Sequence, residues 1–248
     1  MSNVSGKHIA AGARVAVTGA ASGIGAATAR LLQAQGWRVA CLDRNLAGAR
    51  ATAGSNGIAI EIDVADESSV IRAFREAGDN WGGLDALVTA AGIINTTAFF
   101  DTTVAEFRNL FDINVIGSFL SVREGAKYMR KGARICMVAS ISSYTGGGYV
   151  ARGAYATSKG AVLTMMKSCA RELGPQGIAV NAVAPGFIDT PFVASAMSDP
   201  KRRKEVEAAV GKVGSAEQIA ECCAWLISPA ADFVHGSTLI ADGGILMR

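Results

Sequence analysis

Short apolar segments alternate along the chain with longer segments whose apolar residues have helical spacing. Several of the short segments are apolar at nearly every position, which is typical of strands buried on both faces of a parallel sheet. The pattern predicts strands at 14–18, 38–42, 57–62, 84–89, 134–139, 178–183 and 238–241. It predicts helices at 25–35, 66–80, 104–130, 155–173 and 216–227.

The alternation of strand and helix predicts an α/β fold: a doubly wound parallel sheet of about seven strands with helices on both faces. Residues 1–248 contain no linker, low-complexity tract or repeat, so we expect a single domain. Residues 189–211 depart from the pattern, because an apolar segment is followed there by the basic run Lys201-Arg202-Arg203-Lys204. We expect this stretch to be a lid over a ligand crevice. The alternative is a solvated surface excursion.

The charge and hydropathy of the chain exclude several classes of partner. Lys and Arg total 24 against 21 Asp and Glu, and a net charge of +3 does not indicate a nucleic-acid partner. No apolar run reaches the ~18–20 residues of a membrane-spanning helix. Residues 1–13 lack the charged start and apolar centre of a signal peptide, so we expect a cytoplasmic protein with no membrane partner.

The cysteines and histidines do not indicate a metal site. Five cysteines are an odd number, and no pair has metal-ligand spacing. His8 and His235 are the only histidines, which disfavours a His-based nucleophile or a His-rich metal centre. We therefore expect buried free thiols, no bound metal, and chemistry that comes from other side chains.

A glycine-rich turn follows the first predicted strand and precedes a predicted helix. Its sequence is Thr18-Gly19-Ala20-Ala21-Ser22-Gly23-Ile24-Gly25. Glycines let the backbone approach a pyrophosphate, and the start of the helix offers free N–H groups and a positive dipole end to the phosphates. The place of the turn between strand and helix predicts a dinucleotide site.

Asp43 ends the second strand and bears on which dinucleotide is bound. A carboxylate there can accept hydrogen bonds from both hydroxyls of the adenosine ribose, and it would repel a 2′-phosphate. The next residue, Arg44, could counter that repulsion, but the glycine turn carries the uncharged Ser22 and no basic residue. NAD is therefore favoured over NADP. The alternative is that Asp43 is only a turn residue at a strand end.

Together with further motifs, this turn makes the chain resemble the short-chain dehydrogenase/reductase family over residues 18–244. The further motifs are, in order, Asp63-Val64, Ala90-Ala91-Gly92, Asn114, a serine near position 140, Tyr155-x-x-x-Lys159, Pro185-Gly186 to Thr190, and Asp242-Gly243-Gly244. The resemblance implies a single NAD(P)-binding, Rossmann-like domain over residues 1–248. It also implies an oxidoreductase that interconverts a secondary alcohol and a ketone.

The resemblance assigns roles to four catalytic residues. Tyr155 would exchange the hydroxyl proton of the substrate. Lys159, on the same helix face, would bind the nicotinamide ribose and, with the positive nicotinamide, lower the pKa of the phenol. The hydroxyl of Ser140 would bind the substrate oxygen. Asn114 would bind a water that links Lys159 to solvent.

Two features depart from the family pattern. Spacing back from Tyr155 points to Ser142 as the catalytic serine, whereas the strand start and the residues after it point to Ser140. We choose Ser140, which requires a longer loop at 146–152. In addition, Thr89-Ala90-Ala91-Gly92 replaces the family's Asn-Asn-Ala-Gly, and the lost Asn usually ties neighbouring strands together.

The remaining cofactor contacts follow from position in the family. Asp63 would reach the adenine amino group beside the backbone of Val64, and Ile188 and Thr190 would contact the nicotinamide half. The expected cofactor-binding residues are Gly19, Ser22, Gly23, Ile24, Gly25, Asp43, Asp63, Val64, Ala90, Gly92, Tyr155, Lys159, Pro185, Gly186, Ile188 and Thr190.

The expected substrate pocket comprises 93–96, 141–143, Tyr149, Phe187 and 192–197, and it is mostly apolar. Such a pocket suits a hydrophobic or ring-bearing small-molecule alcohol or ketone. We therefore expect an NAD-dependent alcohol dehydrogenase. The alternatives are an NADP-dependent biosynthetic carbonyl reductase and a nicotinamide-binding regulator without turnover.

The family further implies assembly into a homotetramer or a homodimer. In the family, helices that correspond to 104–130 and 155–173 pair across a two-fold axis. The apolar content of residues 162–166 exceeds what one sheet face requires, which fits burial on two sides.

Overall fold

The central strands carry apolar side chains at almost every position, because helices cover both faces of the sheet that they form. The computed structural model describes residues 12–148, 150–194 and 200–247. Its main sheet consists of β1 (Arg14–Thr18), β2 (Arg38–Asp43), β3 (Ile58–Glu61), β4 (Leu84–Thr89), β5 (Met129–Val138), β6 (Ala179–Pro185) and β9 (Thr238–Ala241).

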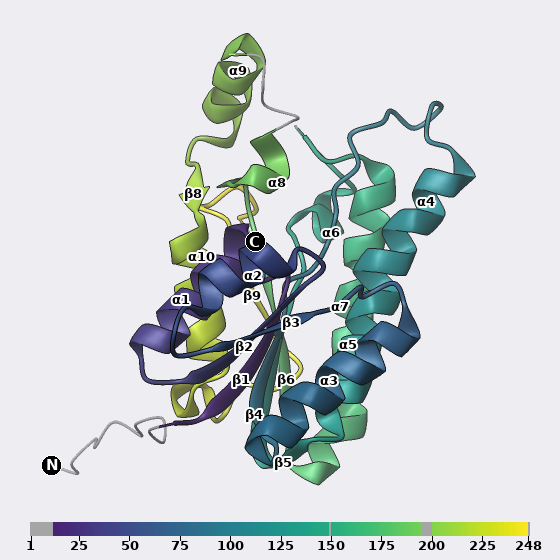
Figure 1. The fold of residues 1–248 in the computed structure, drawn as a ribbon. Helices are drawn as coiled ribbons and strands as arrows, with labels where there is room; N and C mark the ends of the chain where they lie inside the picture. Colours follow the sequence, from purple (N-terminus) through teal and green to yellow (C-terminus); the bar gives the residue numbers. More distant parts are fainter. Residues whose placement is uncertain (1–11, 149, 195–199, 248) are drawn as a thin grey trace, which may run out of the picture.

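All pairings in this sheet are parallel, and the strand order is β3-β2-β1-β4-β5-β6-β9. The order reverses between β1 and β4, which lie side by side although β2 and β3 come between them in the sequence (Figure 1). The seven expected strands and the doubly wound class are therefore confirmed. In folds of this class, ligands bind at the carboxyl ends of the strands where the order reverses.

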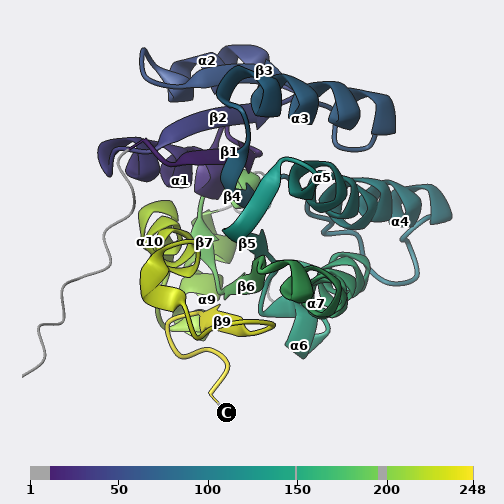
Figure 2. The ribbon, with the colours of Figure 1, turned by 90° about the horizontal axis from the view of Figure 1, so that it is seen from below.

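Helices form a layer on each face of the sheet (Figure 2). One layer contains α1 (Gly23–Ala34), α2 (Leu46–Ala53) and α10 (Ala216–Leu226). The other contains α3 (Glu67–Trp81), α4 (Val104–Phe111), α5 (Gly117–Ala126) and α7 (Gly153–Leu173). Alternate residues of one strand enter opposite cores: Val15 and Val17 pack with the first layer and Ala16 with the second.

The long helix expected at 104–130 is three segments. A π-helical turn (Asp112–Ile116) separates α4 from α5, and α5 ends at Ala126. The expectation was wrong at its C-terminal end, because residues 129 and 130 already belong to β5. Met129 pairs there with Leu84 before the register shifts. The basic residues that follow Met129 resemble a helix end, which is why this part of the strand is not visible in the sequence pattern.

Several short elements have no counterpart in the expected pattern. Helix α2 has small residues and little amphipathic character, and its start is marked only by Asn45, whose side chain accepts a hydrogen bond from the Gly48 N–H. Three further short segments are α6 (Ser142–Thr145) and the 3₁₀ turns Gly174–Gln176 and Pro229–Ala231. Short helices are stabilised mainly by their packing, so their sequence signal is weak.

The stretch that interrupts the pattern forms a separate substructure above the carboxyl ends of the strands (Figure 1). Its base is a two-stranded parallel sheet of β7 (Ile188–Asp189) and β8 (Gly214–Ser215). Between these strands lie α8 (Pro191–Ala194) and α9 (Pro200–Val210). Arg203 of α9 forms ion pairs with Asp189 at 2.5 Å and with Glu207 at 2.8 Å, so the basic run is partly neutralised.

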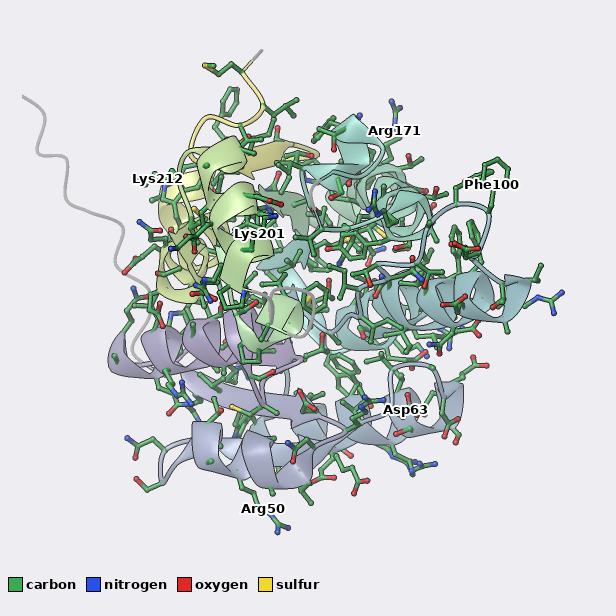
Figure 3. The ribbon with its side chains drawn as sticks, turned by 90° about the horizontal axis from the view of Figure 1, so that it is seen from above. Arg50, Asp63, Phe100, Arg171, Lys201 and Lys212 are labelled. Carbon is green, nitrogen blue, oxygen red and sulfur yellow. The ribbon has the colours of Figure 1, made fainter. Side chains whose placement is uncertain are left out.

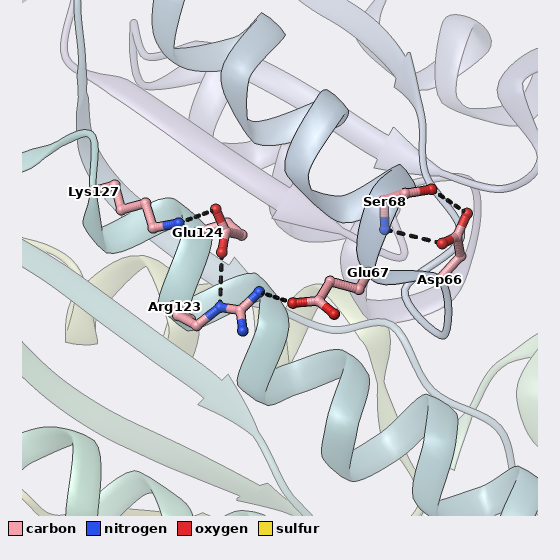
Figure 4. A network of polar contacts seen from close by, with 6 residues as sticks. All are labelled: Asp66, Glu67, Ser68, Arg123, Glu124 and Lys127. Atoms are coloured by element: carbon pink, nitrogen blue, oxygen red, sulfur yellow. Dashed lines mark hydrogen bonds and ion pairs between the residues drawn. The ribbon is translucent and has the colours of Figure 1, made fainter.

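A buried carboxylate joins two helices on the α3–α5 face of the sheet (Figure 4). Glu124 of α5 is 3% exposed and binds Arg123 at 2.7 Å and Lys127 at 2.6 Å. Arg123 in turn binds Glu67, at the start of α3. Burial alone would raise the pKa of Glu124, but its two basic partners hold that pKa below its usual value. The ion pairs therefore connect α3 to α5.

Candidate functional site

The carboxyl ends of β1, β2, β4, β5 and β6 surround a cavity of about 670 Å³. The cavity lies at the point where the strand order reverses. All the expected cofactor-binding residues line it, and so do Ser140, Tyr155 and Lys159. Asn114 does not line the cavity. In the part of the chain that the structure describes, no group of three or more His, Cys, Asp or Glu residues is placed to hold a metal ion.

The glycine turn packs too closely for side chains at two positions. A Cβ at Gly25 would lie 2.2 Å from the carbonyl oxygen of Gly19, and one at Gly19 would lie 2.7 Å from the amide nitrogen of Ala91. The backbone of the turn therefore packs closely against the segment that follows β4. Helix α1 begins at Gly23, so its free N–H groups lie at the cavity. These features fit the pyrophosphate of a dinucleotide.

Asp43 connects the second strand to the glycine turn. Its carboxylate accepts hydrogen bonds from the amides of Ala21 at 3.0 Å and Asn45 at 2.9 Å. Each oxygen keeps a second lone pair for a ribose hydroxyl. Arg44 also lines the cavity and is exposed. Asp63 is likewise at the cavity edge, visible in the view from above (Figure 3), while Val64 beside it is buried.

A threonine replaces the strand tie that the missing Asn usually supplies. The side-chain oxygen of Thr18 accepts hydrogen bonds from the amides of Ala90 at 3.2 Å and Ala91 at 3.3 Å. These bonds join the end of β1 to the segment after β4. Thr89, which stands where the family has its first Asn, is buried and its hydroxyl has no hydrogen-bond partner. The tie is therefore present but comes from the other strand.

Tyr155 and Lys159 lie one turn apart near the start of α7, and both are buried. The Lys159 ammonium donates to the carbonyl of Val138 at 2.8 Å and lies 5.9 Å from the centre of the Tyr155 ring. Burial raises the pKa of Tyr155 to about 12 and lowers that of Lys159 to about 8. Burial thus opposes the expected lowering of the phenol pKa.

Ser140 follows the end of β5 and is buried, and its side chain interacts with the phenol of Tyr155. This interaction lowers the pKa of the phenol, although less than burial raises it. The Ser140 oxygen also accepts a hydrogen bond from the Ser142 amide at 3.1 Å. Ser142, which is the first residue of α6, lines the cavity as well.

Asn114 lies in the π-helical turn behind the cavity and is fully buried. Its side-chain oxygen accepts from the amide of Ile93 at 2.8 Å, and its NH₂ group donates to the Ile93 carbonyl and to Ser158, each at 3.0 Å. Ser158 donates in turn to the carbonyl of Tyr155 at 2.7 Å. The side-chain amide of Asn114 thus connects the loop after β4 to α7. These contacts suit a residue that positions the loop and the helix better than one whose side chain binds a water.

The apolar end of the cavity agrees only in part with the expected pocket. Ile93, Ile94, Ile141, Ser142, Phe187, Phe192 and Val193 line it as expected, whereas Asn95, Thr96, Ser143 and Ala194 do not. Tyr149 and residues 195–197 lie outside the described residues. Thr145, Val150, Ala151 and Ile245 line the cavity and were not expected. Ile245 comes from the end of the chain, and no local pattern in the sequence indicates its position.

Comparisons with known proteins cover almost the whole chain. A family model described as enoyl-(acyl carrier protein) reductase matches residues 19–246. A cis-4-hydroxycyclohexanecarboxylate dehydrogenase from Sinomonas cyclohexanicum is 38% identical over 239 residues, which are 93% of this chain and 96% of that relative. A sorbitol dehydrogenase from Cereibacter sphaeroides is 35% identical over 92% of this chain and 95% of its own length.

A solved structure agrees with the fold over the same extent. The crystal structure of a dehydrogenase/reductase from Sinorhizobium meliloti 1021 has a TM-score of 0.88 to this chain at 34% identity. The match covers 97% of this chain and 98% of that one.

Proposed function

The chain belongs to the short-chain dehydrogenase/reductase family of oxidoreductases, and we propose that it interconverts a secondary alcohol and a ketone with NAD. We propose further that the alcohol is hydrophobic or carries a ring. The observation that carries this proposal is that Ser140, Tyr155 and Lys159 line the same cavity as the glycine turn.

The proposed oxidation needs one proton acceptor and one hydride acceptor. NAD, when bound, supplies the hydride acceptor, so the two electrons leave the carbinol carbon together with its hydrogen. Tyr155 accepts the hydroxyl proton, and the C–O bond becomes C=O. Ser140 donates to the oxygen while its charge develops. Lys159, fixed by the Val138 carbonyl, stabilises the phenolate through its positive charge.

The preference for NAD rests on Asp43. Its carboxylate lies at the cavity edge beside the glycine turn, where it suits two ribose hydroxyls and repels a 2′-phosphate. Arg44 lines the same region and is the feature that favours the alternative, an NADP-dependent carbonyl reductase. A regulator without turnover is the second alternative, and the presence of both Tyr155 and Lys159 disfavours it.

The preference for a hydrophobic or ring-bearing substrate is supported by the apolar end of the cavity. The relative named as a cis-4-hydroxycyclohexanecarboxylate dehydrogenase acts on a cyclic secondary alcohol, as its name states. We also propose that residues 189–211 act as the lid. Phe192 and Val193 of α8 line the cavity, and Val206 of α9 packs in one apolar cluster with Val193.

We propose that the chain forms a homotetramer or a homodimer, with contacts on α4, the π-helical turn after it and α5. Val104, Phe107, Ile116 and Phe119 leave between 37% and 67% of their surface exposed. The apolar side chains of residues 162–166 do not require a second copy of the chain, because three of them are already buried against the sheet of one chain. Exposed apolar surface of this extent is typical of an interface.

A panel of alcohols with NAD tests the proposed function. Cyclohexanol, cis-4-hydroxycyclohexanecarboxylate, sorbitol and a hydroxysteroid would be compared by the absorbance of the reduced cofactor. We expect turnover of at least one cyclic secondary alcohol, and a rate lower by ~10²–10⁴-fold in Tyr155→Phe. Turnover with NADP alone would favour the reductase, and NAD binding without turnover of any of them would favour the regulator.

A further inference from the structure

An aromatic side chain of the proposed lid faces the tyrosine of the site. Phe192 of α8 and Tyr155 of α7 have ring centroids 6.1 Å apart, with their planes tilted by 58°. Both rings line the cavity. Phe192 is 36% exposed, so part of an apolar ring remains uncovered beside the reacting group. Burying such surface against a ligand is favourable.

The packing of its neighbour holds Phe192 in this position. Val193, the next residue of α8, is buried in a small apolar cluster with Val150 and Val206. The Val193 amide donates to the Thr190 carbonyl at 3.1 Å, which fixes the start of the short helix. Phe192 is not part of this cluster. The cluster therefore anchors α8 through Val193, while the ring of Phe192 stays outside the cluster and lines the cavity.

The cavity that Phe192 lines also offers two kinds of uncharged surface. Ile93 and Ile94 contribute aliphatic wall, and Ser142 and Thr145 contribute hydroxyl groups. Among the described lining residues, the charged ones are Asp43, Arg44, Asp63 and Lys159, which belong to the proposed nucleotide half and the catalytic turn. Apart from these four residues, the described lining offers no charged side chain to the part of the substrate that contacts Phe192.

We propose that Phe192 determines substrate specificity by covering one face of a cyclic alcohol whose carbinol is held by Ser140 and Tyr155. This inference rests on the proposed function and deepens it. A ring presents an apolar face of fixed shape to an aromatic side chain, as in other aromatic contacts. An open chain with the same number of carbons must first lose internal rotations to present a comparable face. Phe192 thus favours cyclic over open-chain secondary alcohols.

Cyclohexanol and 2-hexanol provide a matched pair of probes, because each contains one secondary hydroxyl and the same number of carbons. We would measure kcat/KM for both with NAD in the wild type, Phe192→Leu and Phe192→Ala. The control is Phe233→Leu, since Phe233 is fully exposed and does not line the cavity. Phe192→Leu keeps most of the volume if the alanine variant does not fold.

The wild type should prefer cyclohexanol. Phe192→Ala should reduce the ratio of the two kcat/KM values by about 3- to 10-fold, the range expected for one aromatic contact. Phe192→Leu should give a smaller reduction, and Phe233→Leu none. A ratio that stays within about twofold of wild type in both Phe192 variants would overturn the proposal.

A binding measurement separates this inference from the proposed reaction. Saturation-transfer NMR would compare cyclohexanone and 2-hexanone with NAD-loaded protein, and it needs no turnover. Stronger transfer to cyclohexanone that is lost in Phe192→Ala supports the role of Phe192, even if neither alcohol is oxidised and the proposed function therefore fails. Turnover of the alcohols with equal transfer in wild type and variant overturns the role of Phe192 and leaves the proposed function in place. Absence of transfer to either ketone also overturns it.

Discussion

Ser140 and Tyr155 line the same cavity although one follows β5 and the other lies near the start of α7, and the Ser140 side chain lowers the pKa of the Tyr155 phenol. The oxygen of this serine accepts a hydrogen bond from the amide of Ser142 at 3.1 Å. Ser142 thus contributes its backbone to the arrangement, whereas Ser140 contributes the side chain that acts on the tyrosine. This geometry favours Ser140 as the serine that binds the substrate oxygen.

Substitution of the two serines should have different kinetic effects. Ser140→Ala should lower kcat by ~10²–10³-fold, because the lost donor acts on charge formed in the transition state. Tyr155→Phe should cost ~10²–10⁴-fold, the usual contribution of general acid–base catalysis. Ser142→Ala should change KM or substrate preference more than kcat. Steady-state kinetics with NAD would measure these effects. Loss of turnover in Ser142→Ala but not in Ser140→Ala would show that spacing from the tyrosine was the better guide.

Asp43 should decide the choice between NAD and NADP. Wild-type protein should have the higher kcat/KM with NAD on any accepted alcohol. Asp43→Ser should reduce the preference by roughly fivefold or more, since like charges a few ångströms apart repel by at least about 1 kcal/mol. Asp43→Asn is the control for local structure, because it removes the charge but keeps a side-chain oxygen that can still accept a hydrogen bond from the Ala21 amide. Equal values for the two cofactors in the wild type would contradict the prediction.

The buried ammonium of Lys159 should make stability depend on pH. The folded chain releases this proton near pH 8, whereas the unfolded chain keeps it to about pH 10.5. Between these values the unfolded chain binds more protons, so the free energy of unfolding rises with pH. Over the whole window the gain is about 3 kcal/mol. Lys159→Met should lack this rise.

Urea unfolding of wild type and Lys159→Met at pH 7.5 and pH 10, without nucleotide, would measure the effect. Ionisation of Tyr155 is common to both proteins and cancels in the difference. The unpaired Val138 carbonyl in the variant costs a similar amount at both pH values. A difference in stability that does not change with pH would mean that the pKa of Lys159 is not lowered in the folded chain.

The exposed apolar side chains of α4 and α5 should be covered by a second copy of the chain. Light scattering at micromolar concentration should give a dimer or tetramer mass. Phe107→Glu should shift that mass toward the monomer, because a charge would be buried in the interface. Phe100→Glu is a useful comparison, as Phe100 is 96% exposed on the loop before α4 and is labelled at the rim in Figure 3. A monomeric wild type would refute the assembly.

The sequence predicts those parts of the site whose residues lie close together along the chain. The glycine turn, Asp43 and the Tyr155–Lys159 pair each lie within one strand–helix unit, so their spacing alone places them. Thr18 and Ile245 show what such patterns miss. In the sequence Thr18 resembles any other strand residue, and its role becomes visible only when the end of β4 lies beside it in the fold. Ile245 reaches the cavity only because β9 pairs with β6. Their roles depend on contacts between distant segments, which no single window of sequence contains.

The wall of the cavity formed by Pro185 and Gly186 depends on the last strand. The Gly186 amide donates to the Ala241 carbonyl at 3.0 Å, and Pro185 pairs with Ala241 in the sheet. The wall is therefore complete only while residues 238–241 are paired with β6. We expect detachment of this edge strand to weaken nucleotide binding even while the other six strands of the sheet stay paired.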